Sequence, residues 1–301
     1  MIHGILNVYK EAGYTSFDVV AKLRGILKQK KIGHTGTLDP AAEGVLPVCL
    51  GNGTKLCDML TEKTKEYEAV LLLGIDTDTQ DTTGTVLLER EVRVSEKEVR
   101  EVIAGFVGEQ MQIPPMYSAI KVDGKRLYEL AREGKSVERK ARPITIHSIE
   151  VKEIALPKVR ILVHCSKGTY IRTLCHDIGE KLGCGGAMEY LLRTRSGHFS
   201  LENTLTLAQI EELVKQNAIE AHILPMEEAL KDYLPLHVKQ EWKVKIDNGN
   251  PLPPEAFTEA VQSADKEKRR IYNAEGIFFA LYEFEEAKNR WIPDKIFPIT
   301  E

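Results

Sequence analysis

The segment from Gly33 to Gly44 has the residue types of a catalytic loop. It reads Gly-His-Thr-Gly-Thr-Leu-Asp-Pro-Ala-Ala-Glu-Gly, and its glycines allow the backbone of a ligand to approach closely. Asp39 stands directly before Pro40, which biases the aspartate towards an extended backbone. A carboxylate held in this way is a candidate catalytic group. The alternative is an Asx-type turn in which Asp39 only caps its own chain.

A second polar cluster, Ser-Lys-Gly-Thr-Tyr-Ile-Arg, occupies residues 166–172. Gly168 and Thr169 at the start of a helix would offer free backbone N–H groups to an anion. Arg172 then lies in the first turn, where a cation faces the positive end of the helix dipole. Because that position is unfavourable, we expect a partner carboxylate from elsewhere in the chain. The alternative is an exposed surface arginine.

Two possible metal-binding patterns in the sequence do not match the spacing that a metal site needs. Asp76, Asp78 and Asp81 occupy positions 1, 3 and 6 of a candidate calcium loop, but an EF-hand needs Gly at position 6 and an acid at position 12. The chain has Asp81 and Leu87 there. The five cysteines are odd in number and contain no Cys-x-x-Cys pair, so we expect buried thiols and no zinc site.

Hydrophobic periodicity predicts the elements that must position these groups. Ser16 is the predicted cap of a helix that ends near Ile26, and residues 33–40 are predicted to be loop. Further strands are predicted at 2–9, 67–73, 85–88, 144–151 and 159–165, and further helices at 54–60, 96–106, 125–132, 170–182, 207–215 and 226–232. The mixed order predicts an α/β (α+β) fold with a large, mainly antiparallel sheet flanked by helices.

The length of 301 residues is typical of about two domains. The character of the sequence changes near Tyr233-Leu234-Pro235, so we predict one domain at residues 1–232 and a small β-rich domain at 233–301. The second is predicted to contain a helix near 239–247, strands at 270–272 and 277–284, and a tail at 291–299.

Composition and charge exclude several classes of protein. Hydrophobic residues make up 43% and charged residues 29% of the chain, which excludes a disordered or fibrous protein. No apolar stretch approaches the ~18 residues of a membrane span. The N-terminus has no basic leader followed by an apolar core, so we expect a cytoplasmic protein.

The net charge of −4 hides an asymmetry along the chain. Residues 202–301 have a balance of −7, which leaves +3 for residues 1–201. Residues 22–34 hold five basic side chains and no acidic one, and residues 121–142 hold eight basic and four acidic ones. Local patches of this kind suit a phosphate backbone. The alternative for each stretch is a solvated face.

Taken together, these segments resemble the TruB-type tRNA pseudouridine synthases. The string Gly-His-Thr-Gly-Thr-Leu-Asp-Pro-Ala-Ala-Glu-Gly-Val-Leu-Pro at 33–47 resembles the catalytic motif of that family. Lys65-Glu66-Tyr67, the segments 114–121, 124–128 and 131–134, and Lys-Gly-Thr-Tyr-Ile-Arg-Thr-Leu at 167–174 resemble three further motifs, in the same order. The resemblance covers roughly residues 2–230. It implies the pseudouridine synthase fold, and residues 233–301 resemble a PUA-like domain; the alternative there is a module that mainly covers the catalytic domain.

The resemblance also implies roles for single residues. Asp39 aligns with the catalytic aspartate, which either attacks C1′ of the target nucleotide or removes a proton from C2′. Arg172 would pair with Asp39, keep it ionised and supply the expected partner for the helix start. Tyr67 would stack on the uracil and is a candidate for helping to remove the C5 proton.

Five further residues match positions around the pocket. Tyr170 and Leu191 would complete the wall around the base, and His34 would fill space in the tRNA loop vacated by displaced nucleotides. Lys10 and Asp81 match supporting polar positions near the pocket.

The implied reaction converts uridine 55 of the TΨC loop in the T-arm of tRNA to pseudouridine after base flipping. It is an isomerisation, so we expect no cofactor and no metal, and we expect a monomer with no obligate protein partner. Leu192 stands where the family usually has an arginine, which puts one backbone contact in doubt. Two alternatives are a tRNA folding factor that acts on the elbow, possibly alongside catalysis, and a glycosylase that releases uracil.

Overall fold

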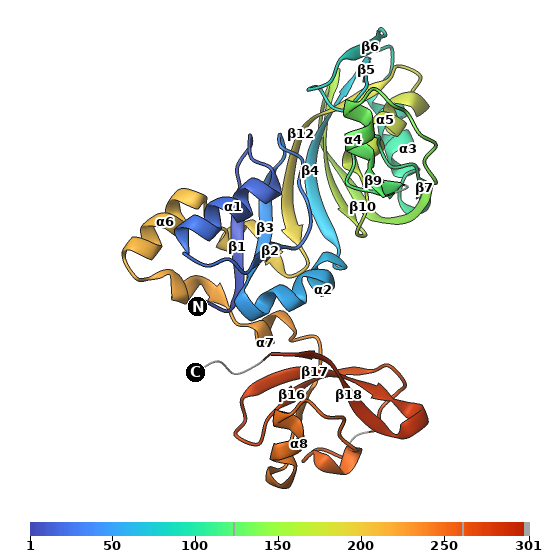
Figure 1. Cartoon of the computed structure of the whole chain (residues 1–301). Helices are drawn as coiled ribbons and strands as arrows, with labels where there is room; N and C mark the ends of the chain where they lie inside the picture. The colour runs from blue at the N-terminus through green and yellow to red at the C-terminus, as the bar shows by residue number, and fades with distance from the viewer. Residues whose placement is uncertain (123, 261, 298–301) are drawn as a thin grey trace.

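The structure is a computed structural model that describes residues 1–122, 124–260 and 262–297 (Figure 1). Asp123 of the basic stretch 121–142 and the last four positions of the predicted C-terminal domain lie outside the described residues. No helix in the described part of the chain is long and apolar enough to cross a membrane.

A ten-stranded sheet forms the body of residues 1–224. Its order is β14 (Ile223–Leu224), β1 (Gly4–Lys10), β3 (Glu43–Leu50), β12 (Gly186–Ser196), β4 (Lys65–Leu73), β11 (Lys158–Cys165), β10 (Arg142–Ala155) and β7 (Gly108–Gln112), with β2 (Ile32–His34) on β3 and β13 (Phe199–Ser200) on β12. The neighbours are antiparallel except β3 and β12, which are parallel. The predicted fold class, a large, mainly antiparallel mixed sheet flanked by helices, is confirmed.

Helices pack on two separate cores along this sheet. α1 (Ser16–Ile26) and α6 (Leu207–Lys215) share one core with β1 and β3, whereas α3 (Glu96–Ala104) and α5 (Ile171–Lys181) share another with β4 and β11. The two halves therefore join at the parallel pair β3 and β12, near the middle of the sheet (Figure 1).

Shorter elements complete this part of the chain. They are α2 (Cys57–Thr61), β5 (Ile75–Thr77), β6 (Val86–Glu89), β8 (Lys121–Val122), β9 (Lys125–Arg126), α4 (Leu127–Arg132) and α7 (Met226–Ala229).

Four local predictions were wrong. The cap of α1 is Thr15, whose side chain accepts the backbone N–H of Asp18, and Ser16 is the first helical residue. Residues 33 and 34 belong to β2, because β3 offers them a partner strand. The central strand β12 was not predicted, and the expected tail after position 290 is the strand β18 (Arg290–Ile296). In each case tertiary pairing or local capping geometry overrides the local sequence pattern.

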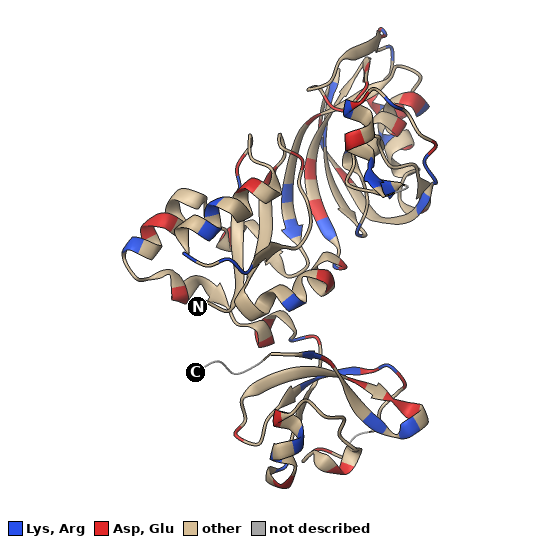
Figure 2. Cartoon of the chain, in the orientation of Figure 1, with Lys and Arg blue, Asp and Glu red and all other residues tan. Residues whose placement is uncertain are grey.

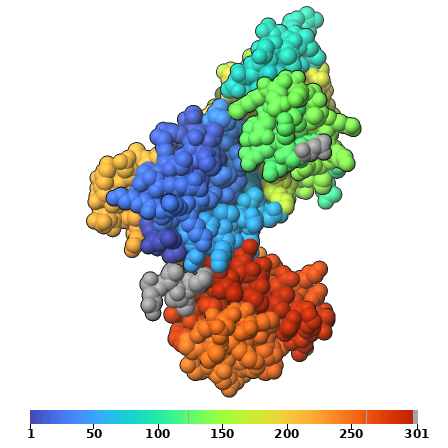
Figure 3. Space-filling model, viewed as in Figure 1, coloured from blue at the N-terminus to red at the C-terminus, as the bar shows by residue number. Residues whose placement is uncertain are grey.

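A second, four-stranded sheet follows residue 234. Its order is β15 (Pro235–His237), β16 (Lys268–Tyr272), β17 (Phe278–Glu285) and β18, and α8 (Lys243–Asp247) accompanies it. Leu281 and Phe297 share a core cluster with Ile5 and Leu56 of the first part, and Lys55 Nζ donates to the Ile296 carbonyl at 2.5 Å. A small C-terminal β-sheet is therefore docked against the larger unit (Figures 1 and 3).

Candidate active site

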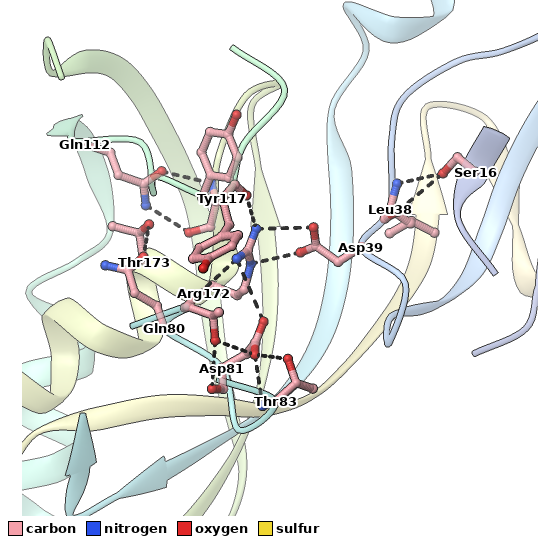
Figure 4. Close-up of polar contacts among 12 residues, drawn as sticks. Ser16, Leu38, Asp39, Gln80, Asp81, Thr83, Gln112, Tyr117, Arg172 and Thr173 are labelled. Carbon is pink, nitrogen blue, oxygen red and sulfur yellow. Dashed lines mark hydrogen bonds and ion pairs between the residues drawn. The ribbon is translucent and has the colours of Figure 1, made fainter. Parts of the chain in front are cut away.

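Asp39 lies on the loop between β2 and β3, where the two halves of the sheet join. The loop is anchored on both sides of the aspartate. Ser16 Oγ accepts the Leu38 backbone N–H at 2.9 Å (Figure 4). Lys10 Nζ, which is fully buried, donates to the carbonyls of Pro40 at 3.1 Å and Ala42 at 2.5 Å. The helix α1 and the strand β1 thereby fix the position from which the Asp39 carboxylate projects.

The Asp39 carboxylate faces the guanidinium of Arg172, in the first turn of α5 (Figure 4). Arg172 Nε lies 2.9 Å from one Asp39 oxygen, and Nη2 donates to the other at 3.2 Å. This fork-on-fork arrangement fixes the direction of the carboxylate as well as pairing its charge. The side chain of Arg172 is only 5% exposed and that of Asp39 is 36% exposed, so the aspartate remains accessible while its partner is buried.

The remaining donors of Arg172 are also used. Nη1 donates to the Thr79 carbonyl at 3.0 Å, and Nη2 donates to the Tyr117 carbonyl at 2.8 Å. Asp81 places a carboxylate oxygen 3.8 Å from Nη1, and the hydroxyl of Thr79 and the backbone N–H of Thr83 hold that aspartate. Arg172 is therefore clamped by two carboxylates and two carbonyls.

The start of α5 has no side-chain cap of its own. Instead, the side-chain amide of Gln112 on β7 accepts the backbone N–H of Tyr170 at 2.8 Å and donates to the Tyr170 carbonyl at 3.0 Å (Figure 4). The expectation that Arg172 needs a carboxylate at this helix start is met by Asp39 and Asp81.

Tyr67 on β4 and Leu191 on β12 are both buried in the core cluster that also contains Leu38 of the Asp39 loop and Ile171 of α5. Burial raises the pKa of the Tyr67 phenol, and the nearby guanidinium of Arg193 opposes that rise. Tyr67 is thus a neutral aromatic side chain placed next to the loop that carries Asp39.

The structure places the predicted site residues at different distances from the pair. Arg172 and the anchoring Lys10 are in direct contact with Asp39 or its loop, whereas Asp81 contacts Arg172. Tyr170 is half-buried at the first position before α5. His34 ends β2, and its Nδ1 accepts the Gly36 backbone N–H at 3.3 Å. His34 is therefore tied to the start of the Asp39 loop.

Burial determines the electrostatics of the site. It raises the pKa of Asp39, and the negative charge of Asp81 adds to this effect, whereas the Arg172 guanidinium opposes it. Burial lowers the pKa of Lys10 to about 8 and also lowers the pKa of His34. The Asp39 carboxylate and the Lys10 ammonium are therefore both held in surroundings that disfavour charge unless an opposite charge is close.

Sequence reasoning missed two residues that support the site. The sequence predicts Ser16 as a helix cap, but in the structure its hydroxyl oxygen accepts the Leu38 backbone N–H of the Asp39 loop. Arg193 is buried on β12, and its Nε donates to the Val45 carbonyl at 2.6 Å. The apolar residues between Ala187 and Leu192 were the signal that could have revealed the strand, whereas no local signal marks Arg193 as buried.

The basic stretches lie on exposed elements on either side of the site. Lys22 and Arg24 project from α1, and Lys125, Arg126 and Arg132 lie on β9 and α4 (Figures 1 and 2). In Figure 1, α1 lies in the half of the sheet that holds β1 and β3, and β9 and α4 lie in the other half, near α3 and α5.

Among the described residues, no group of three or more His, Cys, Asp or Glu side chains is arranged to hold a metal ion. One hollow in the described surface is lined by Met1, Ile2 and residues 27–31, and another by residues between 239 and 262; neither lining includes Asp39. The forked pair of Arg172 and Asp39 is the feature that defines the candidate site.

Comparison with known proteins identifies relatives of the whole chain. Residues 24–171 match the N-terminal domain of the TruB family of pseudouridylate synthases, and residues 172–231 match the tRNA pseudouridylate synthase B C-terminal domain. The tRNA pseudouridine synthase B of Lachnoclostridium phytofermentans is 54% identical over 98% of this chain and 100% of its own length. That of Alkaliphilus oremlandii is 52% identical over 83% and 82% of the two chains.

A solved structure extends the similarity to three dimensions. A chain of an H/ACA RNP bound to a substrate RNA containing 2′-deoxyuridine superposes with a TM-score of 0.75 at 28% identity, over 99% of this chain and 86% of that one.

Proposed function

The chain belongs to the TruB family of pseudouridylate synthases, and we propose that it isomerises uridine 55 in the TΨC loop of tRNA to pseudouridine. The observation that carries this proposal is the forked pair of Arg172 and Asp39, set at 2.9 and 3.2 Å beside the buried ring of Tyr67. A partly exposed carboxylate with a fixed direction, next to an aromatic wall, suits a flipped nucleotide.

The reaction breaks the N1–C1′ bond, turns the uracil and joins C1′ to C5. Asp39 begins it either by attacking C1′ or by removing a proton from C2′. In the last step C5 loses its proton, and the electron pair of the C5–H bond forms the C5–C6 double bond. The π pair of the N1–C6 bond moves to N1, and N1 then takes a proton from solvent. The C5 proton passes through the Tyr67 oxygen to solvent.

Arg172 holds the Asp39 carboxylate in place through these steps. Its two contacts with Asp39 are made by a side chain that is itself fixed by the carbonyls of Thr79 and Tyr117, so the carboxylate is aimed before the substrate arrives. Tyr67, with Leu191 and Tyr170, would enclose the uracil while it is detached from the ribose. His34 would fill the space that displaced nucleotides leave.

RNA binding rests on the two basic stretches at 22–34 and 121–142. Many of their side chains are exposed, and we propose that they contact the phosphates on both sides of a flipped nucleotide. The C-terminal segment 235–296 has slightly more acidic than basic side chains. We propose that residues 1–232 form the catalytic domain and that the chain from residue 233 acts as a PUA-like domain. We also propose that the protein works as a monomer.

The test is turnover on an unmodified tRNA transcript that carries tritium at C5 of its uridines. The wild-type chain is expected to release tritium in proportion to the pseudouridine found at position 55, while Asp39→Asn binds the same tRNA and releases none. Tight binding without release by the wild type would contradict catalysis and favour the folding-factor alternative. Free uracil in the supernatant would indicate a glycosylase. Loss of binding in Asp39→Asn would show that Asp39 is structural.

A further inference from the structure

Arg193 occupies a position that connects the two halves of the site. On β12 it lies directly opposite Tyr67 of the antiparallel neighbour β4. On the other side it is paired with Gly44 of the parallel neighbour β3. Directly opposed residues on paired strands bring their side chains together on one face of the sheet. Arg193 therefore stands between the strand that carries Tyr67 and the strand that follows the Asp39 loop.

The guanidinium of Arg193 reaches both neighbours. Nε donates to the Val45 carbonyl at 2.6 Å, and Nη2 donates to the Gly36 carbonyl at 3.3 Å, at the start of the Asp39 loop. The guanidinium also lies close enough to the Tyr67 phenol, its cross-strand partner, to oppose the rise that burial causes in the pKa of that phenol. Since an arginine can only donate, the phenol oxygen of Tyr67 can meet it only as an acceptor.

The burial of Arg193 is unusual for an arginine. Its residue exposure is 1%, and no carboxylate oxygen of the described residues forms an ion pair with it within 4.0 Å. The other buried arginine of the site, Arg172, has two carboxylates. A desolvated guanidinium with only neutral partners is costly, and it favours negative charge on whatever oxygen it faces. Here that oxygen belongs to Tyr67.

We propose that Arg193 is a positioning residue for the removal of the C5 proton. It holds the Tyr67 oxygen at a fixed place relative to the Asp39 loop, and it stabilises the phenolate that forms when the hydroxyl proton leaves to solvent. The phenolate then takes the C5 proton and becomes a neutral phenol again. This inference rests on the proposed function, because it assigns Arg193 to the last step of the isomerisation. Arg193 acts through Tyr67 and does not touch the substrate.

Arg193→Lys tests the proposal, because lysine keeps the charge but loses the fork that spans Val45, Gly36 and Tyr67. Single-turnover rates are measured on tRNA with uridine at position 55 and on tRNA with 5-fluorouridine there. The fluorinated base can form the C1′–C5 bond but has no C5 proton to lose. The matched control is Arg195→Lys, on the same strand but exposed and paired with Glu66.

We expect Arg193→Lys to slow the uridine reaction by about 10²-fold, as the loss of one oriented donor does. Rearrangement of 5-fluorouridine should stay within about twofold of wild type, the limit within which independent effects add. Tyr67→Phe should show the same contrast between the two substrates, and Arg195→Lys should slow neither. Affinity for tRNA is measured for each variant and is expected to stay at the wild-type value.

Equal slowing of both substrates would overturn the proposal, because Arg193 would then act before the C5 proton is lost. An unchanged rate on uridine would also overturn it. If Arg193→Lys does not fold, Arg193→Gln, which keeps neutral N–H donors, is tested in its place. If neither variant folds, Arg193 serves only the stability of the fold and the proposal is overturned. Failure of the wild type to form pseudouridine would instead refute the proposed function.

Discussion

Replacing Arg172 by methionine is the sharpest test of how this site holds its carboxylate. Methionine fills much of the same buried volume but has no donor. Its introduction removes both contacts with Asp39 and the hydrogen bonds to the carbonyls of Thr79 and Tyr117. Asp81, whose side chain is 14% exposed, loses its only cation at the site within the described residues.

The structure sets the magnitude of the effect. Breaking a fully buried ion pair by removing one partner costs about 3–5 kcal/mol. Water can solvate part of Asp39, because its side chain is 36% exposed, so the lower end applies. We expect the free energy of unfolding to fall by about 3 kcal/mol. The rate should fall by about 10²- to 10³-fold, because the carboxylate is no longer aimed.

Two measurements separate these effects. Urea denaturation gives the change in unfolding free energy, and single-turnover tritium release at saturating enzyme gives the rate on the folded fraction. Without Arg172 the pKa of Asp39 should rise further, so the acid limb of the rate profile should move to higher pH. Arg172→Lys keeps the charge without the fork and should lie between wild type and Arg172→Met in both measurements.

The reasoning would be refuted by a folded Arg172→Met protein that turns over within about threefold of the wild-type rate. The same conclusion would follow if the acid limb stayed in place while the rate fell. In that case the arginine would act on RNA binding or on stability, and tRNA affinity measured alongside would distinguish the two.

Three further results are expected. Burial raises the pKa of Asp39 above the ordinary 3.8, and the reaction needs the ionised carboxylate. We therefore expect kcat/KM to decline as the pH falls through that raised pKa, at a higher pH than for an ordinary aspartate. An acid limb of the pH–rate profile at or below pH 3.8 would contradict this. Lys10→Met removes the donor to two loop carbonyls. In urea denaturation it should lower the free energy of unfolding by about 2 kcal/mol. An unchanged urea midpoint would contradict this. Ser16→Ala should slow tritium release at little cost in stability. Thr15→Ala should lower the free energy of unfolding by about 1 kcal/mol and leave the rate of tritium release unchanged. The reverse pattern would indicate that Ser16 is the helix cap.

The local chemistry of the site could be predicted from sequence because it is written in contiguous motifs. The loop at 33–44, the helix start at 166–172 and the position of Tyr67 each carry local signals. The prediction that Arg172 needs a distant carboxylate followed from the helix dipole alone. The mixed order of strands and helices likewise predicted the class of sheet.

Other features depend on contacts that no local window contains. β12 was not predicted, because its alternation is broken by register shifts opposite β4. Ser16 and Thr15 are both good capping residue types, and only the closeness of Leu38 decides which one faces the loop. Arg193 gives no sign in sequence that it is buried without a carboxylate.

The sequence by itself therefore determined the class of fold and predicted the candidate reacting groups, since motif spacing and periodicity are properties of the chain. The tertiary structure decided which strand joins the two halves of the sheet, which carboxylates meet Arg172, and that Arg193 lies between Tyr67 and the Asp39 loop. These depend on the register between β3, β12 and β4. A shift of one residue would turn every side chain of β12 to the other face, and only packing of the whole sheet fixes that register.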